Sequence, residues 1–321
     1  MSIIHTEYSP ENNNTFVSSS GLFPIYIQSW APEKEEDIKG VFQLTHGMAE
    51  YSDRYEDFGN YLAEKGYAVF IHDHMGHGKS TKSDDDLGYF GEDKDNWKHL
   101  IEDVYSVTKI AKEKYPGKPF YLFGHSMGSF VARGYLEKYS DELDGAVICG
   151  TSGANPAAGL AVYIAATVGK IKGSRYKSNF INNLAFGSYN KKFAKDGDCG
   201  FSWLSVNEDN VSFYNGNKYC GYTFTTSGFM GLFGLLSHVS KIECFEKVKK
   251  DLPLLLISGK DDPVGSYGKG VKEVYDNFIK TGHKLTSIKL FDGLRHEILN
   301  EKCNRDIYDY IIDWLDKVEK N

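Results

Sequence analysis

The sequence lacks the features of a membrane-spanning, nucleic-acid-binding or exported protein. Its longest apolar runs, residues 159–168 and 228–236, are far shorter than the about 20 residues that a membrane-spanning helix needs. No basic run occurs and the net charge is −7, which argues against a nucleic-acid partner. Residues 1–15 contain neither a basic region nor an apolar stretch, so we expect no signal peptide.

The chain also lacks the cysteine pattern of a disulfide framework. The five cysteines are widely scattered and show no C-x-x-C spacing: Cys149, Cys199, Cys220, Cys244 and Cys303. An odd, scattered set fits reduced thiols better than disulfides, and reduced thiols are typical of the cytosol. We therefore expect a cytoplasmic protein.

Strand-like and helix-like segments alternate along most of the 321 residues. The predicted strands are residues 23–30, 40–45, 67–73, 119–124, 143–150, 252–259 and 286–291, and the predicted helices are residues 55–66, 97–115, 127–139, 271–282 and 303–320. This alternation predicts an α/β fold with a mostly parallel sheet and helices on both faces. Pro24 favours an edge position for the first of these strands.

The alternation stops between residues 151 and 249, so we interpret this part as an insertion into a continuing sheet. Residues 161–168 are apolar nearly all round, and they would either line an acyl-chain channel or pack the insertion onto the core. The insertion also carries a basic cluster: Lys170, Lys172, Arg175, Lys177, Lys191, Lys192 and Lys195. These cations form either a solvated face or a transient contact with an anionic lipid surface.

The segment from Gly124 to Gly128 reads Gly-His-Ser-Met-Gly, with a predicted strand before it and a predicted helix after it. A strand that turns into a helix within so few residues places Ser126 on a sharp, strained corner. Because the two glycines have no Cβ, strand and helix can approach closely there. This is the geometry of an exposed nucleophile, and Ser126 is the candidate.

Two later loops supply a candidate acid and a candidate base. Asp262 follows the strand at 252–259 and precedes a proline, which favours extended geometry, while its neighbour Asp261 is the alternative acid. His296 follows the last predicted strand and would lie at the same end of the sheet as Ser126. The order Ser, Asp, His is the one found with a nucleophile elbow on an α/β sheet.

The roles follow from the chemistry of acyl transfer. A serine hydroxyl is a poor nucleophile at neutral pH, so His296 must take its proton and later return it to the leaving group. Asp262 would hold the imidazole in the correct tautomer. The tetrahedral oxyanion needs two N–H donors, for which we predict the backbone N–H groups of Met127 and Met48.

These motifs together resemble the monoacylglycerol lipase and lysophospholipase branch of the α/β-hydrolases, also called serine aminopeptidase-like hydrolases. Five stretches carry the resemblance: residues 46–55, 72–80, 124–128, 262–264 and 295–297. It implies an eight-stranded sheet formed by residues 1–150 and 241–321, with residues 151–240 as a cap. It also implies that Glu50 pairs with Arg54, and that Glu50, Arg54 and His125 bind the substrate's head group.

The sequence therefore predicts a serine hydrolase that cleaves esters of mono-acyl lipids and needs no cofactor. Short-chain or aromatic esterase activity, aminopeptidase activity, and a non-catalytic binding protein with the same fold are the alternatives. The His72, His74 and His77 cluster around Asp73 superficially suggests a metal site. Its spacing is not that of a helical ligand pair, so we expect a polar structural loop and no metal.

Overall fold

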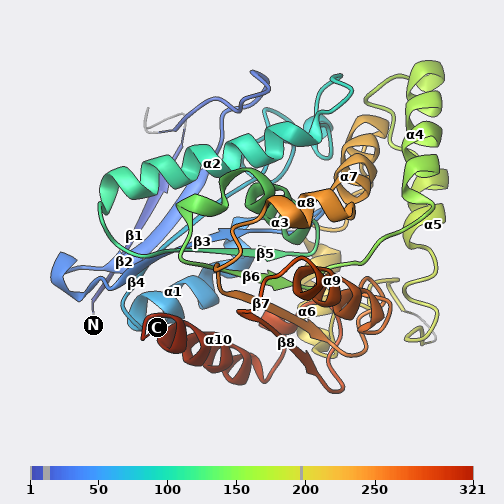
Figure 1. Cartoon of the computed structure of the whole chain (residues 1–321). Coiled ribbons are helices and arrows are strands. Elements are labelled where there is room, and N and C mark those ends of the chain that lie inside the picture. Colours follow the sequence, from blue (N-terminus) through green and yellow to red (C-terminus); the bar gives the residue numbers. More distant parts are fainter. Residues whose placement is uncertain (1, 10–14, 196–197, 321) are drawn as a thin grey trace.

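Eight strands form one sheet in the computed structural model, which describes residues 2–9, 15–195 and 198–320 (Figure 1). The strands are β1 (Ile3–Tyr8), β2 (Ile27–Pro32), β3 (Gly40–Thr45), β4 (Tyr67–His72), β5 (Phe120–His125), β6 (Gly145–Cys149), β7 (Leu254–Gly259) and β8 (Thr286–Phe291). Their order across the sheet is β1-β2-β4-β3-β5-β6-β7-β8. From β4 to β8 all neighbouring strands are parallel, which confirms the predicted mostly parallel sheet.

The predicted edge position of the strand at residues 23–30, which corresponds to β2, was wrong. β2 pairs antiparallel with β4 on one side and with β1 on the other, so β1 forms this edge of the sheet. Pro24 lies outside β2 and forms an isolated bridge with Val17. It therefore removes no hydrogen bond from the ladder, and its presence does not restrict β2 to an edge.

Helices cover both faces of the sheet, and each face has its own apolar core. One face packs against α1 (Glu56–Glu64) and α10 (Asn304–Val318). The other packs against α2 (Trp97–Lys114), α3 (Met127–Tyr139) and α9 (Lys269–Lys280). Side chains alternate between the faces along each buried strand, as Leu122 and Phe123 do on β5. Short 3-10 turns lie at residues 35–37, 52–55, 84–86, 140–142 and 298–300.

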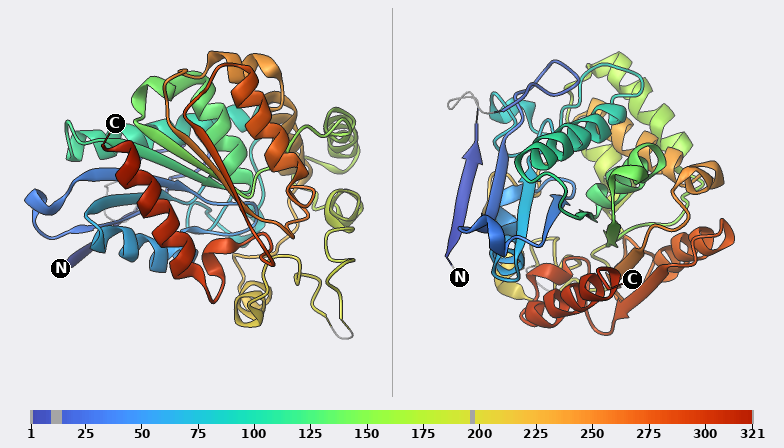
Figure 2. Two further views of the ribbon diagram at one scale, coloured as in Figure 1. Left: turned by 60° about the horizontal axis from the view of Figure 1, so that its bottom comes forward. Right: turned by 60° about the vertical axis from the view of Figure 1, so that its left-hand side comes forward.

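The helices between β6 and β7 form the cap that the break in alternation predicted (Figure 2). They are α4 (Ala158–Lys172), α5 (Asn179–Phe186), α6 (Glu208–Gly216), α7 (Thr226–Val239) and α8 (Ile242–Lys247). α7 packs on α3, and α4 packs on the outer side of α7, so the cap adds two layers to the core (Figure 1). Its limits at residues 151 and 240 remain a prediction. Among the described residues, no helix is both long enough and apolar enough to cross a membrane.

Candidate active site

Ser126 occupies the turn between β5 and α3 with a backbone φ of +54° and ψ of −120°. This strained conformation is rare for a residue with a side chain and is typical of functional sites. An added Cβ at Gly124 would lie 2.3 Å from the carbonyl oxygen of Gly128, and one at Gly128 would lie 2.3 Å from that of Thr45. Glycine at these two positions lets α3 begin directly above the ends of β3 and β5.

The structure brings His296 and Asp262 together, although 34 residues separate them in the chain. His296 Nδ1 lies 2.9 Å from Asp262 Oδ2. The same oxygen accepts from the Ser258 hydroxyl at 3.0 Å, and Asp262 Oδ1 accepts from the backbone N–H of Val264 at 2.8 Å. Both carboxylate oxygens are thus held by groups on or just after β7, and the carboxylate is fully buried.

Asp261, the alternative acid, faces away from this site. Its carboxylate forms an ion pair with Lys192 of the cap at 2.7 Å, on the surface of the protein. Two adjacent residues after β7 therefore have different partners: Asp262 contacts His296, and Asp261 contacts the cap.

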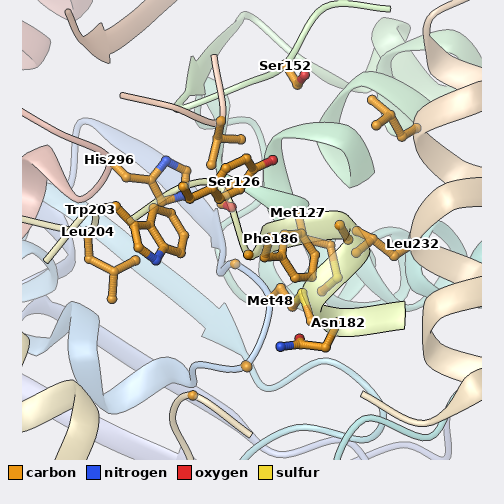
Figure 3. Close-up of a pocket in the computed structure, with 18 of the residues that line it drawn as sticks. Met48, Ser126, Met127, Ser152, Asn182, Phe186, Trp203, Leu204, Leu232 and His296 are labelled. Carbon is orange, nitrogen blue, oxygen red and sulfur yellow. The ribbon is translucent and has the colours of Figure 1, made fainter. Parts of the chain in front are cut away.

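Ser126 and His296 line one cavity, together with Met48 and Met127 (Figure 3). Met127 is the first residue of α3, where backbone N–H groups have no partner within the helix. Met48 lies in the loop after β3. In the close-up view, Ser126 lies between His296 on one side and Met127 on the other.

The loop that carries Met48 is anchored by Glu50. Glu50 Oε1 accepts from the backbone N–H of Gly47 at 2.6 Å and from the Tyr55 hydroxyl at 3.0 Å. An added Cβ at Gly47 would lie 2.6 Å from the same oxygen and 3.0 Å from Ser126 Cβ. The loop can therefore pass this close to Ser126 because residue 47 is glycine.

A buried network of charges lies beside Ser126. Arg54 Nη1 donates to Glu50 Oε2 at 2.7 Å, which is the ion pair that the resemblance implies. Arg54 also donates to both carboxylate oxygens of Glu297, at 2.7 and 2.6 Å, and to the Asn210 amide oxygen at 2.9 Å. Sequence reasoning did not assign a role to Glu297 or to Asn210. The signal for Glu297 was its position next to His296, whereas Asn210 of the cap gave none.

His125 completes this network. Its Nδ1 lies 3.1 Å from Glu50 Oε1, and its Nε2 lies 3.3 Å from the carbonyl oxygen of His296. Both partners are acceptors, so the ring satisfies both contacts only when both nitrogens carry protons. Burial opposes this charge, but the hydrogen bond to Glu50 and its negative charge raise the pKa of His125 above its ordinary value.

The network thus joins the carboxylates of Glu50 and Glu297 to Arg54 and His125. Burial by itself would raise the pKa of Glu50, but the hydrogen bond from His125 and the charge of Arg54 hold it well below the usual range. Burial acts in the same direction on Glu297, and the charge of Arg54 again lowers its pKa. These four side chains join the loop after β3, the elbow and the His296 loop into one unit.

The remaining histidines of this region are structural and neutral. Burial lowers the pKa of His72 to about 3 and that of His77 to about 4. Asp73 accepts from the backbone N–H groups of Ser52 and Lys79, each at 2.7 Å, rather than facing the histidines. This arrangement is that of the expected polar structural loop.

The cavity has a volume of about 600 Å³ and extends from Ser126 into the cap. Most of its lining in the cap and on α3 is apolar: Phe130, Leu160, Ala161, Ile164, Ile181, Leu184, Ala185, Phe186, Leu232, Phe233 and Leu236. Leu232 of α7 lies across the cavity from His296 and Trp203 in Figure 3. Within residues 161–168, Ala161 and Ile164 line the cavity, while Ala165 is buried against the core.

Comparisons with known proteins give matches over most of this chain. The family described as Hydrolase_4, serine aminopeptidase S33, matches residues 36–303. The monoacylglycerol lipase of Mycolicibacterium smegmatis is 25% identical over 311 residues, which are 96% of this chain and 98% of that protein. The monoglyceride lipase of Homo sapiens is 26% identical over 305 residues, which are 93% and 88% of the two chains.

A solved structure gives the same result at the level of the fold. A highly thermostable carboxyl esterase from Bacillus coagulans, determined in complex with glycerol, matches with a TM-score of 0.89 and 28% identity over 98% of both chains. The family match, the elbow and the eight-stranded sheet all lead to one assignment. The chain belongs to the serine aminopeptidase, S33 family and is an α/β-hydrolase of the esterase and lipase type.

Proposed function

We propose that this protein hydrolyses carboxylic esters of mono-acyl lipids, such as monoacylglycerols or lysophospholipids, through an acyl-enzyme intermediate. The observation that carries the proposal is the single cavity of about 600 Å³ that Ser126 and His296 share with apolar side chains of the cap. Its volume lies within the roughly 300–1,000 Å³ that is usual for small-molecule sites. An apolar cavity that begins at a nucleophile suits one acyl chain.

Ser126, His296 and Asp262 have the catalytic roles in this proposal. The Ser126 hydroxyl attacks the ester carbonyl while His296 Nε2 takes its proton, and the tetrahedral intermediate then expels the alcohol, which receives that proton. Water repeats the sequence on the acyl-enzyme and releases the fatty acid. The 2.9 Å contact between His296 Nδ1 and Asp262 supports these roles, since it leaves Nε2 unprotonated and able to act as a base.

The backbone N–H groups of Met48 and Met127 are the proposed oxyanion donors. Met127 N–H lies at the N-terminus of α3, where the helix dipole also favours negative charge. The Glu50 carboxylate supports the other donor by fixing the loop after β3 through Gly47. Loss of one such donor costs roughly 3–4 kcal/mol of transition-state stabilisation in serine hydrolases.

The charges in the cavity wall favour an ester over a peptide with a free amino group. An aminopeptidase needs an acidic side chain free to bind the substrate ammonium. Glu50 and Glu297 are the carboxylates that line the cavity in the described part of the chain, and both are already paired with Arg54. Binding an ammonium there would require breaking a buried ion pair, which costs about 3–5 kcal/mol.

The head-group side of the site is proposed to lie near Glu50 and His125. Both residues line the cavity, whereas Arg54 lies behind them and has an almost completely buried side chain. Arg54 therefore acts on the head group through Glu50 rather than by direct contact. The free state of all five cysteines supports the further proposal that the reaction takes place in the cytoplasm.

The outer surface of the cap supports transient contact with a lipid surface. Tyr163 and Ile171 of α4 and Phe180 of α5, which do not line the cavity, are at least 65% exposed. Lys170, Lys172 and other exposed cations of the same segment lie next to them. Flotation with vesicles that contain anionic lipid tests this contact, and recovery of all the protein in the lipid-free fraction would contradict it.

Fluorophosphonate labelling followed by an acyl-chain series tests the function. Ser126 is expected to be labelled in the folded protein, and Ser126→Ala to lose both the label and the activity. Ser152→Ala is the matched control, because Ser152 lines the same cavity but lies outside the elbow. We expect kcat/KM to rise with chain length for monoacylglycerols. If Ser126 is labelled but the enzyme prefers short-chain or aromatic esters, the protein is a general esterase. If Ser126 is not labelled in the folded protein, a binding protein is indicated.

A further inference from the structure

Three ligand-type side chains from three helices meet on the outer side of α3, away from the cavity. Glu137 belongs to the last turns of α3, His238 to the last turn of α7, and Cys244 to α8. One carboxylate oxygen, one imidazole nitrogen and one sulfur atom from these residues all lie within 4.8 Å of one another. Neither the fold nor the proposed reaction requires this combination.

The contacts within this group are already close. His238 Nε2 lies 2.6 Å from Glu137 Oε2, and the Cys244 thiol donates to the carbonyl oxygen of His238 at 3.1 Å. The Trp97 indole lies against the His238 ring, with 4.6 Å between ring centroids, and fixes its orientation. The side chain of His238 is 30% exposed and that of Glu137 is 12% exposed, so an ion can reach the group from solvent.

We propose that Glu137, His238 and Cys244 bind a divalent ion of borderline softness, for which Zn²⁺ is the best match. Thiolate, imidazole and carboxylate are the three ligand types that Zn²⁺ uses in proteins. Ligand atoms about 2.0–2.3 Å from a tetrahedral ion lie roughly 3.3–3.7 Å apart, so Glu137 Oε2 and His238 Nε2 must separate slightly from 2.6 Å. The ion takes the place of the proton between them, and water fills the fourth position.

The surroundings of the group suit an ion as well. Lys247 pairs with the other oxygen of Glu137, Oε1, at 2.7 Å, which leaves Oε2 for the ion. Such outer partners orient ligands in metal sites.

An ion in this site would join the cap to α3, the helix that follows Ser126. α7 supplies Leu232, Phe233 and Leu236 to the cavity wall, and α8 follows it at the return of the chain to the core. Metal binding would therefore hold α7 and α8, where the chain returns from the cap to the core, against α3.

Titration of the purified full-length protein with Co²⁺ tests the site, because a cobalt–thiolate bond absorbs in the near-ultraviolet. We expect one equivalent to produce this band in the wild type and in Cys303→Ser, which removes an exposed thiol elsewhere. Cys244→Ser is expected to lose the band, and His238→Gln to weaken binding about tenfold or more. Excess Zn²⁺ should raise the melting temperatures of the wild type and of Cys303→Ser by several degrees.

Two outcomes would overturn the proposal. One is the absence of a saturable band in the wild type, which would leave the group as an ordinary hydrogen-bonded ion pair. The other is a band that persists in Cys244→Ser, or that disappears in Cys303→Ser, since the ion would then bind elsewhere. A variant that melts more than a few degrees below the wild type in the absence of metal is replaced by Cys244→Ala, which tests the same ligand.

Discussion

Replacement of Asp262 by Asn is the sharpest test of the proposed site, because the side chain keeps its shape and changes one hydrogen-bonding group. The backbone N–H of Val264 needs an acceptor at Oδ1, so the amide oxygen will take that place. The NH₂ group then lies where Oδ2 accepts from His296 Nδ1 at 2.9 Å. A donor at this point forces Nδ1 to become an acceptor.

The consequence is the wrong tautomer of His296. When Nδ1 accepts, Nε2 carries the proton and cannot take another from Ser126. The equivalent change in serine proteases lowers kcat by about 10⁴, which corresponds to roughly 5 kcal/mol. We expect a loss of the same order in Asp262→Asn, with a melting temperature close to that of the wild type because Ser258 and Val264 keep partners.

Asp261→Asn is the matched control, since the two positions are adjacent and receive the same substitution. It removes an exposed ion pair with Lys192, which contributes about 0–1 kcal/mol to stability and nothing to the tautomer of His296. The assay is kcat and KM on a monoacylglycerol, with thermal melting of all three proteins. Activity of Asp262→Asn within tenfold of the wild type, or a larger loss in Asp261→Asn, would refute the reasoning.

Three further predictions concern stability and chain-length preference. Arg54→Met removes the cation that pairs with both buried carboxylates, Glu50 and Glu297, and should lower the free energy of unfolding in urea by about 3–5 kcal/mol; a loss below about 1 kcal/mol would contradict the network. Burial lowers the pKa of His72 to about 3, so the native protein keeps the ring neutral while the unfolded chain takes up a proton below about pH 6.5. The contribution of the neutral ring to the free energy of unfolding is therefore complete above that pH and is lost as the pH falls. Between pH 7.5 and 5 the free energy of unfolding of the wild type should fall by about 2 kcal/mol more than that of His72→Leu. Parallel curves of this free energy against pH for the two proteins would exclude the pKa shift. Leu232→Trp fills part of the cavity and should lower kcat/KM for long-chain monoacylglycerols at least tenfold while sparing butyrate esters; equal losses for both would place Leu232 outside the acyl path.

Much of the core could be predicted because its signals are local. The strands at Gly40–Thr45 and Thr286–Phe291 have the predicted bounds, and α2 and α3 begin at the predicted residues. Buried parallel strands are continuous apolar runs, and helices with one apolar face have a clear period. β1 was missed because three of the six residues of Ile3–Tyr8 are polar and none is buried, and its pairing partner β2 supplies much of its stabilisation. The sequence of the cap shows no clear helical period of apolar residues, because α4 contacts α7, the cavity and solvent on different sides.

The sequence by itself determined the elbow, since Gly124, Ser126 and Gly128 lie within five residues and their backbone geometry depends on local sterics. It also indicated the order in which the acid and the base follow. Only the tertiary structure decided which charges meet: Arg54 reaches Glu297 across 243 residues of chain, and Glu137 reaches His238 across 101. Such pairs carry no local pattern, because each side chain alone resembles an ordinary solvated charge. Their contacts exist because the sheet and the cap bring distant segments together and exclude water between them.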